Sequence, residues 1–242
     1  MKESEKSELN VLLKKNDLEN NSIWLTNSLT LQKLIGVLGM VMPLLLFVFL
    51  YLDNGLKYPL ESISHYYFTR VCGIFVIILS LLAVFLIVYK GKDKVDFYIS
   101  TVAGILALIV VLFPTSNLTQ LCGDLTKSYA VTILPESNFR IYFHYSAAGL
   151  FFLCLSYMTL FLFTKSNKAP NERGLKKTIR NRIYRTCGTL IFLAVLILFA
   201  GSIKIIPGEF FKNYPLTFWM ETLAIESFGF AWLIKGETLF KD

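Results

Sequence analysis

Four ionisable side chains stand within or beside apolar stretches, where such side chains are costly. Glu221 and Glu226 share one apolar run, His144 lies near the start of another, and His65 lies six residues before a third. An ionisable group at the centre of a membrane costs about 2.5 to 3.5 kcal/mol, so each of these needs a partner or a function. Carboxylates and neutral imidazoles can accept hydrogen bonds, move protons or hold cations.

A polar pocket near the outer membrane surface is one interpretation of this group. Successive helical residues are about 100° apart, so Glu221 and Glu226 lie about 140° apart with Thr222 between them. This arc is expected to face the bundle interior, where it binds a lipid headgroup, a small solute or an ion, or only ties the outer helix ends together. The candidate pocket residues are His65, Arg70, Thr115, His144, Tyr145, Glu221, Thr222 and Glu226.

A metal centre is a further interpretation of the same residues. His65 and His144, with Glu221 or Asp124, would provide the two imidazoles and one carboxylate that suit zinc with an open water position. Water activated there could hydrolyse a lipid ester or amide, with Ser62, Ser64 or Glu226 assisting. The two histidines lie in different elements and have no diagnostic spacing.

Membrane helices are the elements that must position these residues. The 242-residue chain is 55% apolar and 15% aromatic and only 17% charged, which is too apolar for a soluble surface. A bilayer core needs roughly 20 apolar helical residues, and the runs lack the period-two alternation of barrel strands. We therefore predict an all-α bundle of six transmembrane helices at 34–52, 71–89, 97–114, 141–163, 187–203 and 216–234.

The basic residues predict the direction of these helices. Eighteen of the 24 Lys and Arg fall in the N-terminal tail (1–33), the second and fourth loops and the C-terminal end, where Lys235 precedes the tail (237–242), against six in the other loops. The positive-inside rule then places both termini in the cytoplasm, on either side of a transmembrane domain at 34–236. The net charge of +7 thus indicates topology, not nucleic-acid binding. The lysine-, asparagine- and isoleucine-rich composition suggests a bacterial cytoplasmic membrane.

The fourth loop carries a basic amphipathic pattern. Leu175, Ile179 and Ile183 recur at four-residue spacing among eight basic residues, which is typical of a helix lying on anionic lipid. The expected headgroup contacts are Lys176, Lys177, Arg180, Arg182 and Arg185.

Small residues and cysteines add two further expectations. Ser100, Gly104 and Ala107 share one helix face and predict a close helix contact. Cys72 and Cys122 fall on the same, outer side, where a disulfide could form. Neither a phosphate-binding loop nor a His-Glu-x-x-His motif occurs, which excludes the common ATP-driven and zincin classes.

Several strings resemble an uncharacterised bacterial family of multi-span membrane proteins, the domain-of-unknown-function 998 group. The similarity runs from about residue 60 to 238 and implies a multi-helix membrane fold. It also supports His144 and Glu221 as candidate site residues. The family has no agreed activity. The matching strings are Phe113-Pro114-Thr115, His144-Tyr145, 180–185 with Cys187-Gly188, 218–221, Phe228-Gly229, Trp232 and 235–237. Alkaline ceramidase-like hydrolases use three histidines around zinc, and this chain has two.

These observations favour an integral membrane protein that binds or handles a lipid or small hydrophobic solute in an outward-facing polar pocket. A metal-dependent intramembrane hydrolase and a small-solute or ion transporter are the alternatives.

Overall fold

The computed structural model describes residues 28–91, 93–118, 130–166 and 174–238, and this described part is all-helical, with no strand. The all-α prediction is confirmed. The long helices are α2 (Ser28–Asn54), α3 (Cys72–Val88), α4 (Lys94–Leu112), α5 (Asn138–Tyr157), α6 (Leu175–Ser202) and α8 (Leu216–Lys235). The short ones are the 3₁₀ helix η2 (Ile63–Phe68), the π-helical turn η4 (Met158–Leu162) that prolongs α5, and α7 (Gly208–Asn213).

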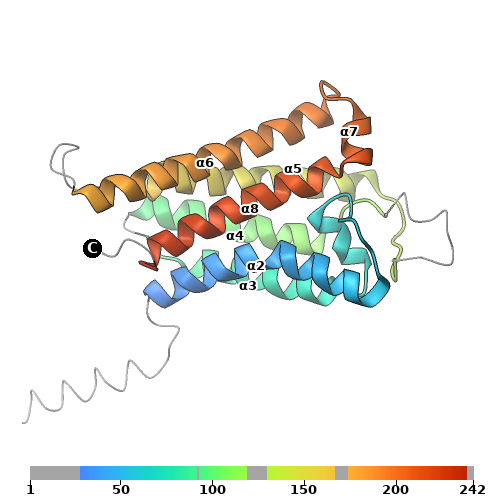
Figure 1. The fold of residues 1–242 in the computed structure, drawn as a ribbon, viewed down its shortest axis with the longest axis horizontal. Helices are drawn as coiled ribbons and strands as arrows, with labels where there is room; N and C mark the ends of the chain where they lie inside the picture. The colour runs from blue at the N-terminus through green and yellow to red at the C-terminus, as the bar shows by residue number, and fades with distance from the viewer. Residues whose placement is uncertain (1–27, 92, 119–129, 167–173, 239–242) are drawn as a thin grey trace, which may run out of the picture.

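The six long helices form a ring in which each packs against its neighbours. Consecutive long helices run in opposite directions, so α2 begins and α8 ends at the same end of the bundle (Figure 1). Each helix contacts the next along the chain, and α8 closes the ring by packing between α6 and α2. Apolar side chains such as Phe75, Leu155, Met158 and Trp232 fill the centre.

Four helices of the described part are long and apolar enough to cross a membrane, namely Leu29–Asn54, Lys94–Leu112, Asn138–Leu162 and Leu175–Ser202. The other two expected spans are less apolar or shorter. Helix α3 is apolar but has 17 residues, which rise about 25 Å. Helix α8 has 20 residues and carries the two acids, yet half of its residues are buried by its neighbours. A helix so enclosed in a bundle needs less apolar surface than one facing lipid.

Helix α6 differs from the sequence prediction at its start. It begins at Leu175, not near Cys187, so the expected surface helix is the first part of a 28-residue helix. Because the helix is unbroken, its buried face includes Cys187 and Gly188 and extends towards the N-terminus through Tyr184 and Arg180. Arg180 is buried on this face, whereas Lys176, Arg182 and Arg185 are exposed and Lys177 is half-buried.

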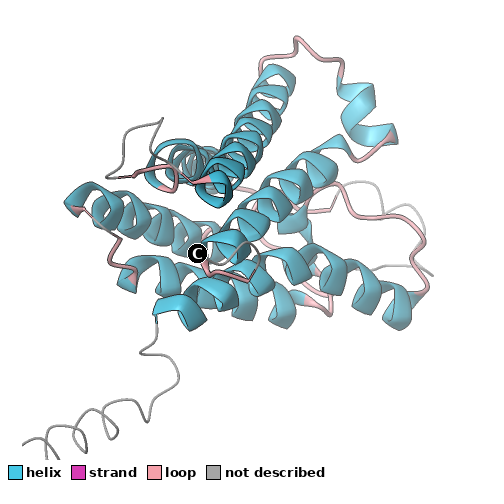
Figure 2. Ribbon diagram, turned by 60° about the vertical axis from the view of Figure 1, so that its left-hand side comes forward, coloured by secondary structure: helices cyan, strands magenta, loops and turns pink. Residues whose placement is uncertain are grey.

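Glycines allow two close helix contacts that set the ring's geometry. At the crossing of α2 and α8, a Cβ on Gly229 would lie 2.8 Å from the carbonyl oxygen of Gly36. Between α3 and α4, a Cβ on Gly104 would lie 2.5 Å from the carbonyl oxygen of Ala83. Ser100 and Ala107 are also buried on α4, so the predicted small-residue contact is confirmed. Figure 2 shows the resulting bundle, with α7 standing outside it beside the ends of α6 and α8.

Candidate functional site

The loop between α2 and α3 folds into the bundle as the buried helix η2. Ser62 is its N-cap: its backbone is extended, and its hydroxyl oxygen accepts a hydrogen bond from the Ser64 amide at 3.1 Å. Thr69 ends the helix, with its hydroxyl donating to the Tyr66 carbonyl at 2.8 Å. Five of the six residues of η2 are buried, so this polar backbone lies among helices and not in water.

Two hydrogen bonds join η2 and the residue before its cap to the first turns of α8. The Ile63 amide donates to Oε2 of Glu221 at 2.7 Å, and the Phe218 amide donates to the Glu61 carbonyl at 3.0 Å. The first amides of any helix lack partners within that helix, so these bonds satisfy donors that burial would otherwise leave unpaired. Glu221 thus has a structural partner, and that partner is a backbone amide.

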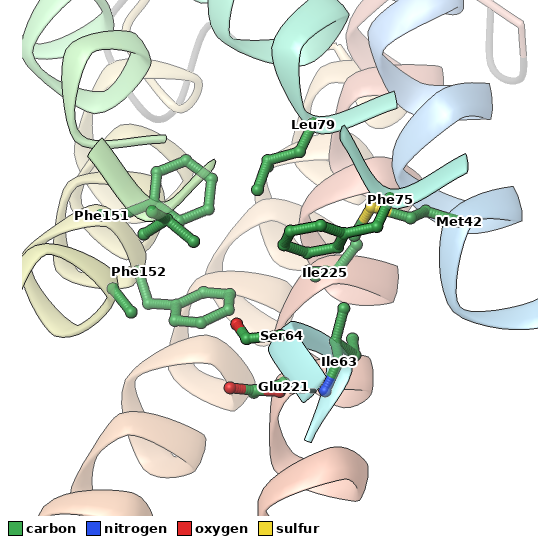
Figure 3. A pocket seen from close by; sticks show the side chains of 11 residues that line it. Met42, Ile63, Ser64, Phe75, Leu79, Phe151, Phe152, Glu221 and Ile225 are labelled. Carbon is green, nitrogen blue, oxygen red and sulfur yellow. Dashed lines mark hydrogen bonds between the residues drawn. The ribbon is translucent and has the colours of Figure 1, made fainter. Parts of the chain in front are cut away.

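A small cavity lies beside this contact (Figure 3). Its volume is ≈ 30 Å³. One water needs about 10–15 Å³, so there is room for about two. Phe75, Phe151 and Phe152 surround the space, and Ser64 and Glu221 lie together at one end of it. The cavity is therefore apolar with one polar end.

His65 lies next to this polar end, in a buried position. Its Nδ1 is 3.1 Å from the Ser62 hydroxyl, and its Nε2 is 3.8 Å from the Glu61 carboxylate. Nε2 is buried and has no hydrogen-bond partner among the described residues. Burial, reinforced by the neighbouring His144, lowers the pKa of His65 from 6.5 to about 4. The imidazole is therefore neutral at neutral pH.

The structure separates most of the residues that the sequence grouped into a pocket. Of the eight candidates, only Glu221 lines the cavity. His144 is buried, with its Nδ1 at 2.7 Å from the Phe113 carbonyl oxygen, and Thr115 is buried. Arg70 is exposed, 3.9 Å from Asp53.

The remaining three candidates do not reach the cavity either. Tyr145 is exposed, with its hydroxyl 3.5 Å from that of Ser116. Thr222 and Glu226 are half-buried on the side of α8 that turns away from the cavity. Glu226 does not share the cavity with Glu221, because its angular offset from Glu221 carries it to the outside of the ring.

The predicted zinc ligands do not form a metal site. Among the described residues, no group of three or more His, Cys, Asp or Glu side chains is placed to hold a metal ion. Each of the three candidates is hydrogen-bonded within the protein instead: His144 to the Phe113 carbonyl, Glu221 to the Ile63 amide and the Ser62 side chain, and His65 to the Ser62 hydroxyl. Asp124, the alternative ligand, and Cys122, the expected partner of Cys72, lie outside the described residues.

Comparison with known proteins adds no relationship. The chain matches no family model, no curated protein and no solved structure. The site must therefore be interpreted from its own geometry.

Sequence reasoning missed the apolar walls of the cavity and the backbone partner of Glu221. Phe75, Phe151 and Phe152 are ordinary core residues by type, and only the closing of the ring brings side chains of α3 and α5 to the same cavity. Ser64 was noted only as an assisting group. One usable signal was present: the stretch 61–68 mixes polar and aromatic residues next to a membrane helix, which is typical of a loop that folds back into protein.

Proposed function

We propose that the protein is an integral membrane protein that binds a lipid or small hydrophobic solute at the cavity beside Glu221. The observation that supports this is the combination of three phenylalanine rings with a carboxylate and a hydroxyl at one end. Binding sites for small molecules are mostly apolar and contain a few polar groups that orient the ligand. The complementary ligand has an apolar body and a hydroxyl or amine that donates to the Glu221 carboxylate.

The cavity as it stands holds waters and not a whole ligand. Ligand entry therefore requires the phenylalanine side chains or η2 to shift, and only the polar end of a larger lipid needs to enter. Helix η2 covers the end of the cavity that faces the outer side in the proposed orientation, since Ile63 and Ser64 are part of the cavity lining. We propose that this segment governs access from the outer side.

A cavity-filling substitution tests the proposal. Ala148→Val adds two methyl groups to the lining, so we expect lipid affinity to fall about tenfold, equivalent to about 1.4 kcal/mol. Native mass spectrometry of the purified protein titrated with phosphatidylethanolamine, phosphatidylglycerol or diacylglycerol measures the bound fraction. Ala200→Val on α6, away from the cavity, is the matched control and should bind like the wild type. Equal affinity in Ala148→Val and the wild type would contradict binding at this cavity.

We also propose six membrane spans with both termini in the cytoplasm of a bacterium. Helices α3 and α8 complete the six because they lie alongside the four longer apolar helices (Figure 1). The basic residues at one end, including exposed Lys176, Arg182 and Arg185, then contact anionic headgroups of the cytoplasmic leaflet.

Cysteine labelling from outside intact cells tests this orientation. Lys57→Cys and Lys90→Cys both place a thiol at an exposed position, at opposite ends of α3. We expect a membrane-impermeant maleimide to label the first variant several-fold above the native cysteines and the second only after permeabilisation. Labelling of Lys90→Cys in intact cells would reverse the proposed orientation.

The other two candidate functions gain no comparable support. The hydrolase interpretation depended on a zinc site. The residues predicted to bind the zinc, His65, His144 and Glu221, are each hydrogen-bonded to other groups of the protein. A transporter requires a continuous polar path, whereas Ser64 and Glu221 are the two polar residues among the eleven that line the cavity.

A further inference from the structure

The outward face of α8 carries a regular stripe of large side chains. Trp219, Leu223, Glu226, Phe230 and Leu233 follow one another at alternating spacings of four and three residues. All five are partly or fully exposed, whereas the opposite face of α8, which includes Phe218, Glu221, Ala224 and Phe228, is buried. Alternating four- and three-residue spacing is the pattern by which one helix packs its side chains between those of another.

Glu226 stands at the centre of this stripe without a partner. It is half-buried and makes no hydrogen bond or ion pair to any residue that the structure describes. In the proposed six-span arrangement it lies about halfway across the bilayer, on the outside of the ring. A carboxyl group in that position is costly unless another molecule satisfies it.

The surroundings leave this face open to a second molecule. Helix α8 packs between α2 and α6, and the front of the bundle in Figure 1 is formed by α8 with these two helices on either side. Most of these contacts use the buried faces of α8. Within the stripe, Leu233 lies beside Gly36 of α2 and Phe230 packs against the core, which leaves Trp219, Leu223 and Glu226 as the part that another molecule can cover.

We propose that a second copy of this chain covers the stripe, forming a two-fold symmetric dimer through α8. In such an interface, residues near the axis contact their own counterparts. A carboxyl group is self-complementary: when one proton is shared, the O–H of one Glu226 donates to the carboxylate of the other. The stripe is self-complementary as well, because each large side chain fits between those of an identical helix. Hydrogen bonds of this kind between membrane helices favour association.

The oligomeric state in lipid bilayers tests the dimer. We expect single-molecule photobleaching of fluorescently labelled protein in dilute proteoliposomes to show two-step traces for the wild type. Glu226→Ala should lower the association constant about three- to tenfold, the range expected for one interhelical hydrogen bond. Glu226→Gln should retain the dimer, because an amide also donates and accepts. The control is Phe161→Ala, which removes an exposed aromatic side chain from the π-helical turn η4 after α5 and should leave the dimer unchanged.

Cross-linking tests the same interface without changing Glu226. Leu223→Cys should form an intermolecular disulfide on mild oxidation, above the background of the native cysteines, whereas Leu193→Cys, exposed on α6, should not. Four results would each overturn the proposal. In photobleaching, these are single-step traces for the wild type at every density, an unchanged association constant in Glu226→Ala, or loss of the dimer in Glu226→Gln. In cross-linking, it is an equal yield of disulfide at the two introduced cysteines.

Discussion

Acidification from pH 7 to pH 4 is expected to reduce the free energy of unfolding, and His65→Gln is expected to remove most of this dependence. In the folded protein, burial and the neighbouring His144 lower the pKa of His65 to about 4, against 6.5 for the exposed group. Between these values the unfolded chain binds a proton that the folded protein does not. Folding is therefore favoured fully above about pH 6.5, and the contribution is lost as the pH falls towards 4.

The expected size of this loss is roughly 3 kcal/mol, because each pKa unit corresponds to about 1.4 kcal/mol. Denaturation of the detergent-solubilised protein at a series of pH values measures it. Carboxylates elsewhere also titrate in this range, so the quantity to compare is the difference between wild type and His65→Gln. Glutamine fills a similar volume and can retain a hydrogen bond to Ser62, which lies 3.1 Å from the imidazole. Parallel pH curves for the two proteins would show that folding does not lower the pKa of His65.

The second large effect is expected at the crossing of α2 and α8. Gly229→Ala places a methyl carbon 2.8 Å from the Gly36 carbonyl oxygen and 3.1 Å from the Met40 amide nitrogen. Since these are backbone atoms, the two helices must separate, and overpacking of this kind costs about 1 to 3 kcal/mol.

Gly149→Ala is the matched control for this substitution. Gly149 also lies within a long helix, but a Cβ there has no neighbour within 4 Å. Alanine favours a helix over glycine by about 1 kcal/mol, so this variant should be as stable as the wild type or more stable. Denaturation midpoints of the two variants are expected to move in opposite directions. A loss of equal size in both variants would show that the crossing is no more sensitive to an added methyl group than an open helix position.

Much of the helical architecture could be predicted from local composition. The apolar runs at 97–114 and 216–234 fall on α4 and α8 with boundaries that differ by a few residues. The small residues Ser100, Gly104 and Ala107 correctly predicted a buried helix face. These features are local: an apolar run forms a helix because its own backbone groups must pair, whatever surrounds it.

The sequence predicted the span at 187–203 and the basic amphipathic segment before it as separate elements, and the structure joins them in one helix, α6. Basic residues such as Lys176 and Arg182 end an apolar run, but they are good helix formers and do not interrupt the backbone hydrogen bonds. The helix therefore continues through the basic segment, and its rotation buries Arg180.

The candidate site was predicted only in part. Two acids in one helix indicated that α8 carries polar contacts, and Glu221 does line the cavity. Its partner is the backbone amide of Ile63, 158 residues away in the chain, and a backbone amide has no signature in the sequence. Similarly, nothing in the spacing of His65 and His144 indicated that their nitrogens would face Ser62 and the Phe113 carbonyl.

The sequence by itself determined where the helices form, and it showed that acids and histidines lie where burial is costly, because apolar length and charge are properties of local segments. The tertiary structure alone decided which of those groups meet. The folding of η2 into the bundle gave Glu221 a donor and covered the cavity, while the rotation of α8 left Glu226 on the outer face. Such pairings depend on how distant segments pack, and that packing depends on the fit of whole helices.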